Sequence, residues 1–197
     1  MSEQQNLKIE IPQLTYNKDN PDPSLVLFYQ QLSTRDFWLD TEINWDNCSF
    51  LIQYIQYLNK NEGDDLTPIT LHIMSGGGEL PTMFTLYDTL INSKIPIHTI
   101  NEGGAHSAAF IIFLAGSKRT MREDALFVAH EGAIGLSGNY RESKAAMQNY
   151  EIDVERMKSI ICSRTEIPES EVELRFSIES DWYIRKDDAK KFGIITE

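Results

Sequence analysis

Cysteine, positive charge and long apolar runs are all scarce in this sequence. Its two cysteines, Cys48 and Cys162, are too few for a disulfide framework and lack the C-x-x-C spacing of redox and zinc motifs. Lysine and arginine total 18 against 30 acidic residues, a net charge of −12 at pH 7. That balance argues against a surface for nucleic acid or anionic lipid. We therefore expect a cytoplasmic protein with free thiols that binds neither nucleic acid nor membrane.

Membrane and nucleotide signals are also missing. The longest wholly apolar run, AAFIIFLA, covers residues 108 to 115, whereas a bilayer-spanning helix needs about 20 residues. The opening MSEQQNLKIEIPQ has no basic stretch followed by an apolar one, so it does not resemble a secretory signal. The sequence contains neither of two glycine-rich phosphate-binding motifs, GxxxxGK[ST] and GxGxxG. We expect no cofactor and no metal.

The length and composition predict one domain with a sizeable core. Hydrophobic residues make up 41% of the 197 residues and charged residues 24%, which is typical of a globular protein. Residues 1–24 are polar and rich in proline, and they predict an arm with one short strand at residues 7–11. The folded domain would then occupy residues 25–197.

Strand and helix patterns alternate along this domain. Glycines cluster where predicted strands end, which is where sites form in α/β folds. The alternating order of strands and helices predicts parallel strands joined by crossover helices, and therefore an α/β layered fold. The predicted strands cover residues 37–39, 69–74, 97–100 and 126–129, and the predicted helices cover residues 47–59, a segment after Pro81 and residues 108–115.

A longer helix is predicted over residues 141–163. Its apolar residues recur at steps of three and four, which gives a narrow stripe suited to packing on another helix: Met147, Tyr150, Val154, Met157 and Ile161. This helix either lies on its own core or pairs between subunits.

The stretch GGAHSAAF surrounds one hydroxyl, Ser107, with very small residues. A serine nucleophile needs a base within hydrogen-bond reach and a carboxylate that orients the base. His72 and His98 lie inside predicted strands, and His106 would diverge from Ser107 if the two opened a helix. His130 ends a strand and is the best-placed base.

A developing negative charge on an attacked carbonyl also needs donors. Gly76-Gly77-Gly78 at a strand end can bring bare backbone N–H groups close to a ligand. The helix after Ser107 adds another N–H and a favourable dipole. The alternative is a glycine-rich turn with no ligand.

Taken together, these segments resemble the Clp protease proteolytic subunit, ClpP. The resemblance runs from about Tyr29 to the C-terminus. It is carried by RDFWLDTEI, ITLHIMSGGG, GGAHSAAFIIFLAGSKR, ALFVAHEG and ESDWYIRKDDAKKFGII. GGAHSAA matches the small-residue G-x-A-x-S-x-[AG] context of that family's nucleophile. LFVAH matches the strand that ends in the family's general base. DWYI, ahead of AKKFGI, matches the run that begins with the third residue of the family's triad.

The resemblance implies a role for particular residues. The catalytic residues would be Ser107, His130 and Asp181, a Ser-His-Asp triad. The backbone N–H groups of Gly77 and Ala108 would form the oxyanion hole. Gly78 and Glu79 would bind the substrate strand.

It also implies an architecture and partners. The fold would be the ClpP/crotonase-like α/β fold of repeated β-β-α units, with a protruding handle at about residues 132–163. The protein would form a homo-oligomer of heptameric rings, with two rings stacked around an inner chamber. Its substrates would be unfolded polypeptides fed in by a hexameric AAA+ unfoldase, which would be the partner that uses ATP.

Three departures set this sequence apart from the family. Gly76 replaces the proline of the usual S-P-G-G, Glu131-Gly132 replaces Gln-Pro after the base, and Ser180 replaces a common arginine that pairs across the ring interface. They are typical of a divergent branch, with a phage-borne origin left open.

Three other functions fit parts of the pattern. One is a non-catalytic ring subunit, although such homologues lack triad members. Another is a crotonase-type acyl-CoA enzyme, which needs no Ser-His-Asp set. The last is a phage head-maturation protease with the same fold.

Overall fold

The computed structural model describes residues 23–61, 66–178 and 181–197. The strand predicted at residues 7–11 and the position of Ser180 lie outside these ranges. The domain boundary predicted after residue 24 falls inside a helix, α1 (Pro23–Thr34).

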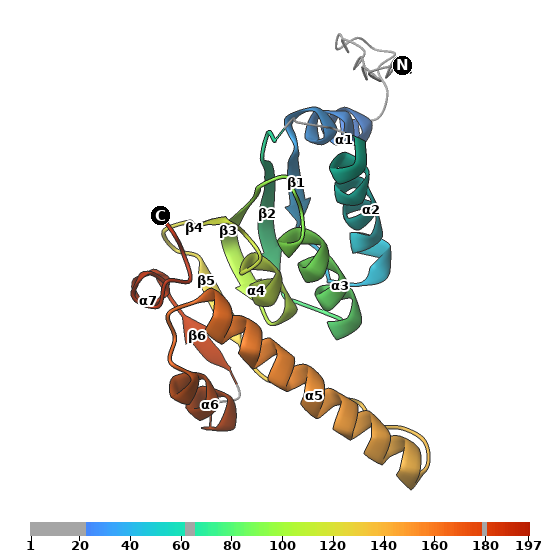
Figure 1. Cartoon of the computed structure of the whole chain (residues 1–197), viewed down its shortest axis with the longest axis vertical. Helices are drawn as coiled ribbons and strands as arrows, with labels where there is room; N and C mark the ends of the chain where they lie inside the picture. Colours follow the sequence, from blue (N-terminus) through green and yellow to red (C-terminus); the bar gives the residue numbers. More distant parts are fainter. Residues whose placement is uncertain (1–22, 62–65, 179–180) are drawn as a thin grey trace, which may run out of the picture.

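A six-stranded sheet lies at the centre of the molecule (Figure 1). Its strands follow the order β1-β2-β3-β5-β6, and β4 also pairs with β3. All pairings are parallel except that of β5 with β6, which is antiparallel. The parallel strands agree with the predicted α/β layered fold. The strands are β1 (Asp36–Leu39), β2 (Ile69–Ser75), β3 (Ile97–His106), β4 (Lys118–Met121), β5 (Leu126–Ala129) and β6 (Trp182–Ile184).

The four strands predicted within the described residues are confirmed, but β3 is longer than expected. Its first half pairs with β4, and the glycine-rich half, Gly104 to His106, pairs with β5. The sequence predicts that this strand ends before its glycines, whereas pairing on both sides keeps them extended up to His106. The register between β2 and β3 shifts at this point, between Ile73 and Ser75.

The predicted helices are also confirmed, and the described residues form three more. The predicted ones are α2 (Trp45–Asn61), α3 (Leu80–Ile91), α4 (Ala108–Phe113) and α5 (Tyr140–Arg164), and the others are α1, α6 (Glu169–Ile178) and α7 (Lys186–Lys191). Within these helices, the apolar stripes face inward: Leu51, Ile55 and Leu58 of α2 and Met83, Leu86 and Leu90 of α3 are buried.

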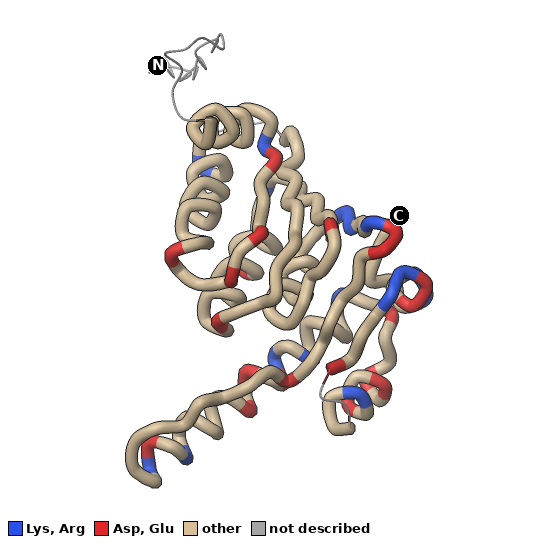
Figure 2. Tube along the Cα trace, turned by 180° about the vertical axis from the view of Figure 1, so that it is seen from behind, with Lys and Arg blue, Asp and Glu red and all other residues tan. Residues whose placement is uncertain are grey.

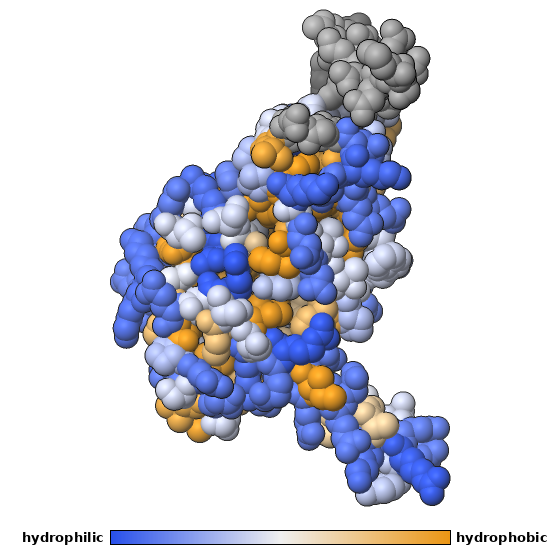
Figure 3. Space-filling model, viewed as in Figure 1, coloured by the Kyte–Doolittle hydropathy of each residue, from blue (hydrophilic) through white to orange (hydrophobic). Residues whose placement is uncertain are grey.

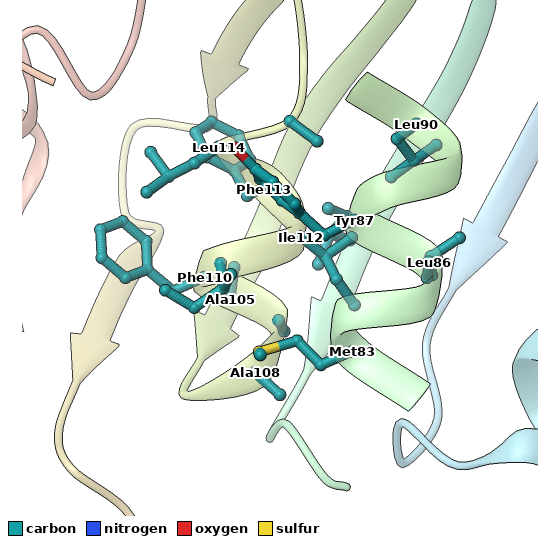
Figure 4. Close-up of a cluster of buried hydrophobic side chains, with 14 of the residues drawn as sticks. Met83, Leu86, Tyr87, Leu90, Ala105, Ala108, Phe110, Ile112, Phe113 and Leu114 are labelled. Atoms are coloured by element: carbon teal, nitrogen blue, oxygen red, sulfur yellow. The ribbon is translucent and has the colours of Figure 1, made fainter. Parts of the chain in front are cut away.

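Helix α4 lies at the centre of the core. Every residue from Ala108 to Ala115 is at most 3% exposed, as expected for a short segment that is apolar all round. Figure 4 shows its side chains, among them Phe110 and Phe113, packed between α3 and the strands. The Phe113 ring also contacts Phe127 of β5, with centroids 4.7 Å apart. Dense packing of this kind leaves α4 little freedom to move.

Helix α5 projects away from the rest of the molecule (Figure 1). Asn139 caps it, accepting from the Arg141 and Glu142 N–H groups, while the Glu142 carboxylate accepts from the Asn139 N–H. Its buried residues, Val154, Met157 and Ile161, all lie in the second half. Acidic and basic residues are both spread along it (Figure 2). The predicted stripe therefore packs on the core from Tyr150 onward, and Met147 lies beyond the core.

Within the described ranges, no helix is both long and apolar enough to cross a bilayer.

Candidate active site

Ser107 occupies the sharp turn between β3 and α4. Its φ of 53° and ψ of −123° lie outside the regions that non-glycine residues favour. The turn is held because the Ser107 N–H donates to the Val128 carbonyl at 2.7 Å. Strained backbone that the surrounding structure holds in place is a frequent feature of active sites. The turn places the Ser107 hydroxyl at the N-terminus of a rigid, buried helix.

Close contacts within the chain explain why the residues around Ser107 are small. A Cβ on Gly77 would lie 2.8 Å from the Ser107 Cβ and 2.9 Å from the His106 carbonyl oxygen. A Cβ on Gly104 would lie 2.7 Å from Nε2 of His106. The glycines therefore let the chain pack closely against Ser107 and under the His106 ring.

His130 and Asp181 meet where β5 ends and β6 begins. Because Ala129 pairs with Trp182 in the antiparallel register, the next residues out on each strand are His130 and Asp181. Nδ1 of His130 lies 3.0 Å from an Asp181 carboxylate oxygen. Their side chains are 29% and 38% exposed, so solutes can reach them. The arrangement suits an imidazole whose Nδ1–H is held by a carboxylate while Nε2 stays available.

Two tyrosines that the sequence did not reveal support this pair. The Tyr183 hydroxyl donates to the second Asp181 oxygen at 3.3 Å. The Tyr150 hydroxyl, on α5, donates to the Glu131 carbonyl at 2.6 Å and so fixes the segment after His130. Tyr183 lies in the DWYI run, two residues after Asp181, but that run does not indicate its hydrogen bond. The role of Tyr150 depends on a contact between segments 19 residues apart.

Ser107 and His130 line the same small apolar pocket, which is too narrow in this structure to admit a water molecule. Its other lining residues are all apolar and come from α4, β5, α5 and α6: Phe110, Ile111, Ala129, Met157, Ile161 and Phe176. Among the described residues, no hydrogen bond joins the Ser107 hydroxyl to His130. Catalytic hydrogen bonds are often long in unliganded enzymes and tighten with substrate.

The glycine loop after β2 is tied to Ile43. The Ile43 N–H donates to the Gly77 carbonyl at 2.9 Å, and the Glu79 N–H donates to the Ile43 carbonyl at 2.7 Å. This pattern turns the N–H and carbonyl of Gly78 away from Ile43. The Gly77 N–H, in contrast, donates to the Ser75 hydroxyl at 3.2 Å. A Cβ on Gly78 would overlap the Ile43 backbone.

The remaining predicted positions have simpler surroundings. The Ala108 N–H is among the first of α4, a position without an acceptor inside its own helix. The Glu79 carboxylate accepts from the Thr82 hydroxyl at 3.1 Å, at the start of α3. His72, on β2, is paired with Glu102 at 2.7 Å. Across the described residues, no three His, Cys, Asp or Glu side chains gather as metal ligands would.

Comparison with known proteins identifies the family of this fold. The family described as Clp protease matches residues 22–197. The chain belongs to the Clp protease family. It is 27% identical over 183 residues to the ATP-dependent Clp protease proteolytic subunit 2 of Treponema denticola, covering 92% of this chain and 88% of that protein.

Solved structures show the same architecture. A point mutant of ClpP1 from Listeria monocytogenes superposes with a TM-score of 0.74 at 22% sequence identity, covering 87% of this chain and 94% of that one. The predicted ClpP fold is thereby confirmed.

Proposed function

We propose that this Clp protease family member is a serine endopeptidase with Ser107, His130 and Asp181 as its triad. The observation that carries the proposal is the His130–Asp181 pair, at 3.0 Å, beside a serine held in a strained turn. His130 and Asp181 lie 51 positions apart in the chain, so their meeting is a product of the fold.

The chemistry follows from this geometry. The Ser107 hydroxyl attacks the scissile carbonyl while Nε2 of His130 takes its proton, and Asp181 stabilises the imidazolium that forms. His130 then gives the proton to the leaving amine, and an acyl-enzyme remains on Ser107. Water, activated by the same imidazole, attacks the acyl carbonyl and restores the hydroxyl.

Backbone donors would bind the oxyanion. Ala108 supplies the first N–H of α4, as expected from the sequence. Gly77 is the second expected donor, but its N–H is already directed to Ser75. Gly78 turns its N–H away from Ile43, so it can serve either as this donor or, as expected from the sequence, in pairing with a substrate strand. In the first case Gly77 contributes mainly by fitting against Ser107.

The apolar pocket beside Ser107 and His130 is closed in this structure, and we propose that it opens to receive the side chain before the scissile bond. Met157 and Phe176 close it from α5 and α6. An apolar side chain gains the most free energy from burial against such apolar lining residues. We therefore propose cleavage after apolar residues.

The same proposal includes assembly. The family relationship supports heptameric rings, two of them stacked, with α5 as the handle between rings. It also supports a hexameric AAA+ unfoldase that delivers unfolded polypeptides. Within the described part of the chain Ser107 and His130 share a pocket without a hydrogen bond, which fits a triad that closes when substrate or neighbouring subunits bind.

A fluorophosphonate probe tests the proposed function directly. The wild-type protein should be labelled on Ser107, and S107A should not be labelled while keeping the same particle mass. Peptides should be cleaved without a partner, whereas folded substrates should require an unfoldase and ATP. No labelling would leave a non-catalytic ring subunit, and cleavage restricted to a capsid scaffold would indicate a head-maturation protease.

A further inference from the structure

His106 lies on the same face of the sheet as the His130–Asp181 pair. It pairs with Val128 in β5, and Val128 pairs with Tyr183 in β6. Because successive side chains along a strand alternate between faces, residues two positions away share a face. His130 follows Val128 by two residues and Asp181 precedes Tyr183 by two. All of these side chains therefore project to the same side as His106.

The His106 ring has an unsatisfied nitrogen. Its Nε2 is buried and lacks a hydrogen-bond partner among the described residues. It lies against Gly104, where a Cβ would be only 2.7 Å away. Buried polar atoms in native structures are nearly always paired, so an exception calls for an explanation. The proposed triad chemistry gives His106 no role.

The charges that act on His106 belong to the catalytic pair. Burial lowers the pKa of His106, Asp181 raises it and His130 lowers it, with a net lowering. The Tyr183 hydroxyl, on the same face, donates to Asp181. Glu102, on the same strand as His106, is already bonded to Arg122 and His72. The carboxylate able to attract a protonated His106 is therefore Asp181.

We propose that His106 is a positioning residue that leaves Asp181 to His130 while its imidazole is neutral and draws Asp181 away once protonated. This inference rests on the serine peptidase function proposed above. A neutral ring offers the carboxylate no charge, so Asp181 stays on Nδ1 of His130. A protonated ring adds a second cation beside one carboxylate. Acid then acts twice, on the base itself and on the group that orients it.

The pH dependence of kcat/KM tests this directly. On the acid limb, the wild type should fall with a slope between one and two in log kcat/KM against pH, because two protons inactivate it. H106Q should fall with a slope of one. H98Q, a histidine replacement near the other end of the same strand, should keep the steeper limb. Equal slopes in the wild type and H106Q would overturn the proposal.

A fixed charge provides a second test that does not depend on titration. H106K and H106M have side chains of similar length, but the ammonium of H106K has an ordinary pKa of about 10.4, so it stays charged at pH 8 unless burial lowers that pKa by more than about two units. At pH 8, H106K should have kcat/KM about tenfold below H106M, with most of the loss in kcat. Equal activities for the two variants would contradict competition for Asp181.

Failure of this inference is distinguishable from failure of the proposed function. If the wild type does not react with the fluorophosphonate at pH 8, the peptidase function itself is wrong. If it reacts and the His106 variants match their controls, the function stands and the role of His106 is wrong. Thermal unfolding of each variant at pH 8 identifies any variant that fails to fold. H106N is then measured in place of an uncharged His106 variant that does not fold.

Discussion

At the scale of single residues, Gly77 and Gly76 are neighbours with opposite constraints. Gly77 has a φ of 100°, and a Cβ there would lie 2.8 Å from the Ser107 Cβ. A Cβ on Gly76 would meet nothing within 4 Å. We expect G77A to lose about 1–3 kcal/mol of stability and to react with a fluorophosphonate about 100-fold more slowly or worse. G76A should retain both properties, and equal behaviour of the two variants would contradict the tight packing on Ser107.

The histidines should rank clearly in a peptidase assay. H130A removes the proposed base and should lower kcat by about 10⁴-fold or more. H106A removes a residue that acts through Asp181, and its effect at pH 8 should be far milder. Both variants should be measured at pH 8 on one peptide with matched particle mass. The reverse ranking would transfer the role of base to His106.

Acid should also destabilise the fold through His106. Because burial outweighs the other influences and lowers the pKa of His106 in the folded state, the unfolded chain binds this proton more readily. The contribution of His106 to the free energy of unfolding is therefore complete above the unfolded pKa, about 6.5, and is lost as pH falls below it. Chemical unfolding of the wild type and H106M at pH 8 and pH 5.5 should show a smaller acid loss in H106M. Equal losses of unfolding free energy in the two proteins would indicate that the His106 ring is less buried in solution.

At the scale of elements, a hydrogen bond joins α5 to the segment after the proposed base, His130. The Tyr150 hydroxyl donates to the Glu131 carbonyl at 2.6 Å, directly after His130. Y150F keeps the ring and removes this bond, so we expect kcat to fall about three- to tenfold, with stability lowered by about 1 kcal/mol. Y140F on the same helix is the control, because Tyr140 is 79% exposed. If Y150F and Y140F have the same kcat, the bond does not position His130.

A buried arginine joins the far end of α4 to the C-terminal segment. Arg119 is 6% exposed and donates to the carbonyls of Gly116, Arg164, Gly193 and Ile194. Burial lowers its pKa to about 10, so it stays charged at neutral pH. R119M removes the guanidinium donor from the carbonyls of Arg164, Gly193 and Ile194 and should cost about 3–5 kcal/mol in urea unfolding, whereas the Gly116 carbonyl still accepts from Arg164. R122M, at a side chain 63% exposed, should cost far less.

Element types were predictable where the apolar pattern was strong. The i, i+3, i+4 pattern of α3 and the apolar run of α4 each gave the correct helix. The last part of β3 was missed because its glycines carry no strand signal, and pairing with β5 decides its structure. The short strand β4 was missed because its residues, KRTM, gave no recognisable pattern.

The candidate site shows a similar division. The small residues around Ser107 and the strand before His130 are local signals. Asp181 came from the family resemblance alone, because no local pattern connects it with a histidine 51 positions away. The bond of Tyr150 to Glu131 is a consequence of tertiary packing, whereas the contacts of Tyr183 with Asp181 and of His106 with Gly104 are local but depend on side-chain conformation. Sequence patterns do not record such contacts.

At the scale of the whole molecule, α5 and α6 leave apolar side chains exposed. Met147 and Ile152 of α5 and Leu174 and Ile178 of α6 are 37%, 60%, 49% and 67% exposed. Figure 3 shows apolar residues over these helices among hydrophilic ones. Burial of such residues between subunits would offset part of the cost of association. The proposed handle therefore has both the length and the surface for contact between rings.

Ring contact should nevertheless be weaker than in a ClpP with arginine before the catalytic aspartate. Ser180 occupies that position and cannot form a bidentate, charge-assisted pair. Arg141 and Lys144, near the outer end of α5, are cations that could replace it at the proposed contact. Both are exposed, so salt would screen what they contribute. We expect the proposed fourteen-subunit particle to separate into seven-subunit rings on dilution and in high salt.

Analytical ultracentrifugation over a concentration series, with peptidase activity measured on the same samples, tests this expectation. S180R supplies the missing arginine and should shift the separation to about tenfold lower protein concentration, if its acidic partner is present across the interface. S177R, at the end of α6, is the matched control for added charge. Activity should fall together with ring separation, because α5 carries both the proposed ring contact and the Tyr150 bond that holds the segment after His130. A wild-type particle that remains a tetradecamer at nanomolar concentration and high salt would refute weak ring coupling.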